Sequence, residues 1–228
     1  MSNDWLQEWS QSKIDLASRL SSGECGGSYA EAVIIICNVL SAISADIWPG
    51  RNIDKKRFVE LLFKYSNSME SCETISVPLL IDTFRECGNI KLANKLKMEL
   101  LPFSDTRVIT GNDSDKTIGD LKTDYPEIEI TVLKRHSYSC ILYEDIRSGY
   151  AHEYQPGGRA DSWPMSSDRD NCLVSYTNRL TNAGTVNRLI HFNVSWLVRL
   201  AGEVVGNLVK ENPMPTFTRY TSWWLEAT

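Results

Sequence analysis

Three side chains that could act on a phosphodiester bond lie close together in the segment "RSGYAHEY" at 147–154. Arg147 carries a planar guanidinium that stays charged at physiological pH and suits charge stabilisation on a phosphate. His152 is one of only 3 histidines in the chain, and an imidazole pKa of about 6.5 suits proton transfer near neutral pH. RNA supplies its own nucleophile, the 2′-hydroxyl. The pattern therefore predicts metal-independent RNA cleavage that leaves a 2′,3′-cyclic phosphate and a 5′-hydroxyl, with Tyr154 stacking on a base or donating to a phosphate.

The spacing of these residues resembles the R-x4-H-x-Y motif of the HEPN superfamily, most closely over residues 140–156, and is similar to that of uncharacterised bacterial HEPN-like proteins. The resemblance implies an all-helical fold with the motif near the end of a late helix. It implies homodimers in which two motifs form one composite cleft. It also implies an endoribonuclease acting as a toxin, defence or stress effector, and a nucleotidyltransferase antitoxin that adds AMP to Tyr154. The chain departs from many HEPN nucleases at Ser148, where they have Asn, Asp or His. The alternative is a non-catalytic, dimeric HEPN-like module that binds RNA or a nucleotide or serves as a scaffold.

The separation of Arg147 and His152 raises a geometric problem. Five residues turn about 140° beyond one full turn of an ideal α-helix, so the two side chains do not share a face. Either the helix ends near Gly149, or each site draws on two chains. The small residues Gly149 and Ala151 would let two backbones approach across a two-fold axis, or would only permit tight packing within one chain.

Two carboxylates, Glu144 and Asp145, precede Arg147 by about one turn. They form either a solvated helix face with an ion pair of modest worth or a group that orients Arg147 or His152. We expect Asp145 and Ser148, together with the motif tyrosine, to bind the substrate or to be modified.

Composition restricts the function classes. The chain has 228 residues, an apolar fraction of 42%, a charged fraction of 23% and a formal net charge of −5. This acidic balance argues against a general nucleic-acid coat, which would be basic, but permits a local basic patch that grips RNA. The N-terminal segment shows no basic stretch followed by an apolar one, and the apolar run at 32–40 is shorter than the roughly 20 residues of a membrane span. We expect a cytoplasmic protein without a membrane span.

Neither a metal nor a cofactor is expected. The 6 cysteines show neither C-x-x-C nor zinc-finger spacing, which favours reduced, mostly buried thiols. The segment "GECGG" at 23–27 lacks the G-x-G-x-x-G spacing of a dinucleotide loop and follows a helical pattern rather than a strand.

Apolar residues at helical spacing predict the helices that position the motif. Ser28 and Glu31 form a capping box before a nearly all-apolar segment that should be the central buried helix. Other expected features are Asp54 as an N-cap, Pro78 in a first turn, a helix over about 137–152, Asn193 as the N-cap of the last helix, and the Trp223–Trp224 pair packed onto the bundle.

The remaining segments complete the expected fold. Residues 103–126 are polar and broken, which predicts a long loop. Two short segments within about 171–192 are rich in β-forming residues and flank the turn-like segment "RLTNAG", which predicts a β-hairpin. His191 lies in an alternating, strand-like run and is expected to be a packing residue. The chain should therefore form one mainly α domain over 1–228, a helical bundle with a small β-hairpin insertion before the last helix.

Overall fold

Helices make up most of the described chain, as the sequence predicts. The computed structural model describes residues 3–66, 72–101, 109–162, 174–180, 186–211 and 222–227. The helices are α1 (Asn3–Ser21), α2 (Tyr29–Ile47), α3 (Asp54–Tyr65), α4 (Val77–Glu86), α5 (Ile90–Leu100), α6 (Gly111–Ser114), α7 (Ile118–Asp124), α8 (Ile130–Arg135), α9 (Tyr138–Ile141), α10 (Ser148–Glu153) and α11 (Val194–Lys210), with a 3₁₀ turn η1 (Glu24–Gly26) and a π-helical segment η3 (Leu142–Arg147). The strands are β1 (Ile109–Thr110), β2 (Val174–Leu180) and β3 (Val186–Phe192). The predicted class, mainly α with a small β-hairpin before the last helix, is confirmed.

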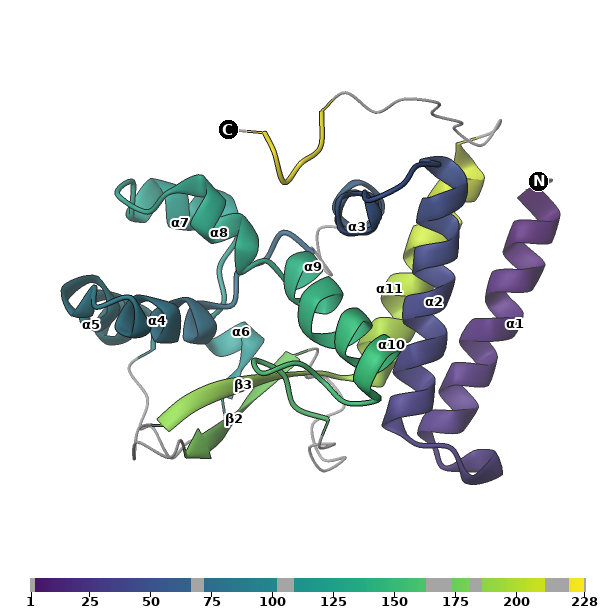
Figure 1. The fold of residues 1–228 in the computed structure, drawn as a ribbon, viewed down its shortest axis with the longest axis horizontal. Coiled ribbons are helices and arrows are strands. Elements are labelled where there is room, and N and C mark those ends of the chain that lie inside the picture. Colours follow the sequence, from purple (N-terminus) through teal and green to yellow (C-terminus); the bar gives the residue numbers. More distant parts are fainter. Residues whose placement is uncertain are drawn as a thin grey trace.

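Helix α2 is the central buried helix that the sequence predicts. The capping box of Ser28 and Glu31 begins it, because these two side chains satisfy backbone N–H groups that the first turn leaves free. Its apolar positions pack against α1, α3 and α11, and α1, α2 and α11 lie side by side in Figure 1. Among the described helices, α2 alone is long and apolar enough to span a membrane, a property that the buried core helix of a protein shares.

The motif lies on a composite helix that crosses the middle of the molecule (Figure 1). Helix α9 passes directly into the π-helical segment η3 and then into α10. Within this run the N–H of Ser148 donates to the carbonyl of Tyr143, a five-residue spacing that is typical of a π turn. The predicted helix over about 137–152 is confirmed, and it contacts both α2 and α3.

The small sheet is antiparallel, with the strand order β1-β2-β3. Strands β2 and β3 form the predicted hairpin, in which Tyr176 pairs with Ile190. The predicted long loop over 103–126 is wrong for residues 109–126, which contain β1, α6 and α7; residues 102–108 lie outside the described part. A helix forms in this polar segment because it is capped locally: the Thr117 side chain accepts a hydrogen bond from the N–H of Asp120 and so begins α7.

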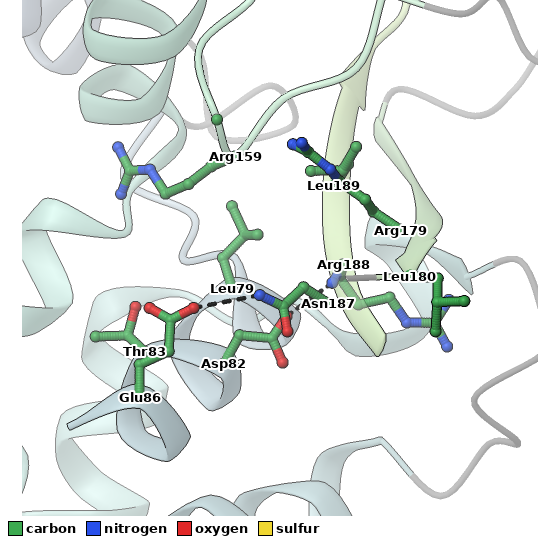
Figure 2. A pocket seen from close by; sticks show the side chains of 11 residues that line it. Leu79, Asp82, Thr83, Glu86, Arg159, Arg179, Leu180, Asn187, Arg188 and Leu189 are labelled. Atoms are coloured by element: carbon green, nitrogen blue, oxygen red, sulfur yellow. Dashed lines mark hydrogen bonds between the residues drawn. The ribbon is translucent and has the colours of Figure 1, made fainter. Parts of the chain in front are cut away.

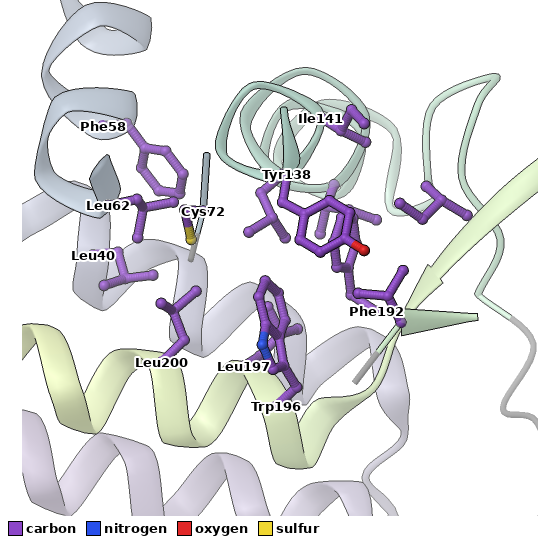
Figure 3. Packing of buried hydrophobic residues seen from close by; sticks show 14 of the residues in the cluster. Leu40, Phe58, Leu62, Cys72, Tyr138, Ile141, Phe192, Trp196, Leu197 and Leu200 are labelled. Atoms are coloured by element: carbon purple, nitrogen blue, oxygen red, sulfur yellow. The ribbon is translucent and has the colours of Figure 1, made fainter. Parts of the chain in front are cut away.

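The core joins the helices to the sheet (Figure 3). Trp196 of α11 stacks on Phe192 of β3, with 5.3 Å between ring centroids, and Tyr138 of α9 packs edge-on against both. The Trp223–Trp224 pair packs onto this bundle as expected: Trp223 meets Trp48 edge-on, and Trp224 stacks on Phe63.

Most predicted helix ends are confirmed. Pro78 lies in the first turn of α4, and Asn193 caps α11. Asp54 is not the N-cap of α3: Ile53 occupies that position, and the Asp54 carboxylate pairs with Arg57 instead.

The cysteines with described side chains are free thiols. Three of them, Cys37, Cys72 and Cys140, are buried, and Cys87 is exposed.

A buried polar cluster around Asp115 joins elements that are distant in sequence. Its carboxylate accepts hydrogen bonds from the hydroxyls of Tyr138 and Tyr176, from the Ser114 hydroxyl at 3.0 Å and from the Val77 N–H at 3.1 Å. Burial raises the pKa of Asp115 to about 7, although the hydrogen bonds act in the opposite direction. The cluster connects the start of α4 with α9 and β2.

Candidate functional site

Arg147 ends the π-helical segment and turns toward α2. Its Nε lies 3.4 Å from the Ser41 hydroxyl, and its guanidinium carbon lies 5.3 Å from the centre of the Tyr143 ring. The side chain is half-buried. Contact with an aromatic face suits a guanidinium and holds it in one orientation.

His152 lies in the last turn of α10 and is exposed to solvent. Within the described parts of the chain, its imidazole makes no hydrogen bond or ion pair, in contrast to the two other histidines. His136 and His191 are buried, and each ring contacts a backbone carbonyl. Burial, the largest cause, lowers the pKa of both rings. The predicted packing role of His191 is confirmed, and His152 alone among the three imidazoles presents its ring to solvent.

Tyr154 follows α10 in a backbone conformation that is rare for a bulky residue. Its φ of 55° and ψ of 27° lie in the left-handed region. The side chain is 57% exposed, and its hydroxyl donates to the Glu31 carboxylate at the start of α2. A strained residue at the end of the motif is an observation from which function can be inferred.

One chain does not bring Arg147 and Tyr154 together. Their contacts on α2, Ser41 and Glu31, are ten residues apart, which corresponds to about 15 Å along the helix axis. The explanation in which the helix ends near Gly149 is wrong, because α10 continues to Glu153. The predicted separation of Arg147 and His152 onto different faces agrees with a half-buried arginine against α2 and an exposed histidine.

Gly149 is required by packing within the chain. A Cβ at this position would lie 2.5 Å from the carbonyl oxygen of Gln155 and 2.8 Å from the backbone nitrogen of Gly157. The chain therefore turns back over α10 after the motif. Of the two expected roles for the small residues, tight packing inside one chain accounts for Gly149, whereas Ala151 is exposed.

The carboxylates before the motif bind Arg159 rather than Arg147. Asp145 is buried and accepts from Nε of Arg159 at 2.8 Å. Glu144 accepts from Arg159 and from Lys55, each at 2.6 Å. Burial by itself would raise the pKa of Glu144, but Lys55 and Arg159 lower it. These contacts show a local ion-pair network that fixes the loop after the motif, and not a group that orients Arg147.

A cavity of about 510 Å³ opens beside Tyr154. Its walls come from the end of α1, the turn before α2, the first turn of α2, α10 and the segment after it. The lining residues are all uncharged: Ser21, Ser22, Gly23, Gly27, Ser28, Tyr29, Ala30, Tyr150, Tyr154, Gln155, Pro156 and Ser162. No local sequence pattern indicates this cavity, because its walls combine residues 21–30 with residues 150–162.

A second cavity of about 320 Å³ lies between α4 and the hairpin (Figure 2). Its walls are charged and carry both signs. Arg159, Arg179 and Arg188 contribute the positive charges, and Asp82 and Glu86 contribute the negative ones. Asp82 accepts from the backbone N–H of Arg188 at 2.7 Å, and this contact joins α4 to β3.

The described residues contain no group of three His, Cys, Asp or Glu side chains placed to hold a metal ion. No protein-family model, curated protein or solved structure matches this chain.

Proposed function

We propose that this protein is a metal-independent endoribonuclease of HEPN type, acting as a toxin, defence or stress effector. One observation carries the proposal: Arg147, half-buried, ends the π-helical segment, and an exposed, unpartnered His152 follows it on the next stretch of the same helix. Such segments are rare and are frequently found at functional sites. A free imidazole and a permanently charged guanidinium supply the two functions that phosphodiester cleavage in RNA needs, proton transfer and charge stabilisation.

In the proposed reaction the 2′-oxygen of the ribose attacks the adjacent phosphorus. Its proton passes to His152, and the bond from phosphorus to the 5′-oxygen of the next nucleotide breaks. That oxygen leaves as a hydroxyl after taking up a proton. Arg147 stabilises the charge on the pentacoordinate phosphate through its guanidinium fork. The products are a 2′,3′-cyclic phosphate and a 5′-hydroxyl.

The separation of Arg147 and His152 supports a homodimer in which each site takes Arg147 from one chain and His152 from the other. A two-fold axis would produce two equivalent composite sites. Mixing two inactive variants tests this arrangement. After refolding equal amounts of Arg147→Ala and His152→Ala together, half of the dimers are mixed and each has one intact site, so about a quarter of wild-type activity should return. If both residues act within one chain, the mixture stays inactive.

The first experiment measures cleavage of RNA in the presence of EDTA. Wild type should cut, whereas Arg147→Ala and His152→Ala should not, provided that all three proteins fold and elute alike. Equal cleavage by all three would assign the activity to another site or to a contaminant. An inert wild type with a mass increase of one AMP on Tyr154 would indicate silencing by a nucleotidyltransferase. An inert, unmodified wild type would remove the nuclease proposal.

The second candidate function is a non-catalytic module that binds RNA or a nucleotide as a dimer. The observation in its favour is that the Arg147 side chain is held by Ser41 and Tyr143 and lies far from Tyr154. RNA binding without cleavage, unchanged by His152→Ala, would support this candidate over the enzyme.

A further inference from the structure

We propose that the cavity beside Tyr154 binds one unpaired nucleobase. The proposal deepens the proposed function because it names the part of an RNA strand that is recognised next to His152. Binding of a base does not require cleavage, so the two proposals can fail separately.

The chemistry of the walls selects a neutral, aromatic ligand. All residues that line the cavity are uncharged, and they include the side chains of Tyr29, Tyr150 and Tyr154 and several serine hydroxyls. The volume of about 510 Å³ lies within the range of roughly 300–1,000 Å³ that is typical of small-molecule sites. The cavity between α4 and the hairpin differs, because its arginine and carboxylate side chains suit charged groups.

The Tyr150 hydroxyl is a buried hydrogen-bonding group at the wall of the cavity. The residue is only 4% exposed, and its hydroxyl has no partner at hydrogen-bond geometry within the described residues, although the Ser162 side chain of the same cavity wall lies close enough to lower its pKa. Burying a hydroxyl in this state is unfavourable, so a ligand that reached it would remove the cost. Burial raises the pKa of Tyr150 to about 12, which keeps the hydroxyl protonated at neutral pH. We infer that it donates to a carbonyl or ring nitrogen on the edge of a base that displaces the neighbouring Ser162 side chain.

Two further tyrosines provide ring faces. Tyr29 is held in place by its hydroxyl, which donates to the carbonyl of Phe192 at 3.0 Å, and its ring lies 6.2 Å from that of Tyr150. Tyr154 lines the cavity, and its hydrogen bond to Glu31 holds the side chain in place. An exposed aromatic ring that is held in one orientation provides a stacking surface for a base.

The test separates base contacts from backbone contacts by using two uncleavable strands. One is a fluorescein-labelled 2′-O-methyl RNA of eight nucleotides, which lacks the attacking hydroxyl, and the other is a strand of equal length without bases. Binding is measured by fluorescence anisotropy at fixed salt. We expect Tyr154→Ala to weaken binding of the strand with bases by about fivefold or more, and Tyr150→Phe to weaken it by about threefold. Binding of the base-free strand should not change.

Tyr125→Phe is the matched control, because the Tyr125 hydroxyl donates to Glu99, away from the cavity. It should bind both strands as wild type does. Tyr150→Phe keeps the ring and removes only a hydroxyl whose one hydrogen-bonding neighbour is the Ser162 side chain, so this variant should fold. Equal binding of both strands by wild type, or wild-type binding by both Tyr150→Phe and Tyr154→Ala, would overturn the proposal.

Two further measurements show whether the base comes from a free nucleotide or from an RNA strand, and whether base binding and RNA cleavage can fail separately. Competition by AMP that depends on Tyr150 would support a site for free nucleotides, and competition by the strand alone would support a site for RNA. Base-dependent binding without cleavage of ordinary RNA would keep the base site and remove the nuclease. Cleavage of RNA by a protein whose binding ignores bases would remove the base site and keep the nuclease.

Discussion

Replacing Gly149 with alanine tests how the chain folds back over the motif. The added methyl group would lie 2.5 Å from the Gln155 carbonyl oxygen, 2.8 Å from the Gly157 nitrogen and 3.1 Å from the Pro156 carbonyl carbon. All three are backbone atoms, so no side-chain rotation relieves the contact. Either α10 or the segment that follows it must move.

The magnitude follows from two opposing effects. Alanine in place of glycine inside a helix favours folding by about 1 kcal/mol. Overpacking typically costs about 1–3 kcal/mol, and contact with rigid backbone places Gly149→Ala at the upper end. The expected net loss in the free energy of unfolding is about 2 kcal/mol. For a chain of this size the midpoint of thermal unfolding should fall by about 4–8 °C.

Gly206→Ala is the control, because this glycine is exposed on α11 and nothing lies within 4 Å of an added Cβ. It should gain up to about 1 kcal/mol and unfold about 2–4 °C higher than wild type. Circular dichroism during heating measures both variants, and gel filtration reports their oligomeric state. If Gly149→Ala is as stable as Gly206→Ala, the packing described for residues 155–157 is wrong. If it is stable but elutes as a smaller species than wild type, Gly149 lies between protomers.

Three further changes test other contacts. Asp115→Ala leaves the buried hydroxyls of Tyr138 and Tyr176 without their acceptor and should lower the free energy of unfolding in urea titrations by about 2–4 kcal/mol. A loss below about 1 kcal/mol would show that the Asp115 cluster does not stabilise the fold. Asp145→Asn breaks the pair with Arg159 and should cost about 2 kcal/mol, less than the 3–5 kcal/mol of a fully buried pair because the arginine side chain is 31% exposed. As a control, Lys55→Met removes a half-buried lysine at the edge of the network and should change stability by less than about 1 kcal/mol. Burial lowers the pKa of His191 in the folded protein. As the pH falls, His191 therefore takes up a proton in the unfolded chain before it does so in the folded one. The stability that neutral His191 contributes above about pH 6.5 is lost in the same range. Wild type should therefore lose more stability between pH 7.5 and 5.5 than His191→Gln, and equal losses would contradict a buried, neutral imidazole.

Sequence by itself determined the features that depend on neighbours along the chain. The capping box of Ser28 and Glu31 and the Asn193 cap are readable because each uses backbone groups within one helical turn. The hairpin is readable because two short segments rich in β-forming residues flank a turn-like one, and the run around Arg147 and His152 is readable as a helix. The helices between residues 109 and 126 were not predicted because α6 and α7, with 4 and 7 residues, are too short for helical periodicity to be recognised.

Only the tertiary structure decided what surrounds the motif. Arg147 contacts Ser41 across 106 residues of sequence, and Tyr154 contacts Glu31 across 123. Asp145 binds Arg159, a pair that no helical spacing indicates. The cavity beside Tyr154 combines residues 21–30 with residues 150–162. The physical reason is that local hydrogen bonding and amphipathic spacing select elements, whereas packing between distant elements determines which side chains meet.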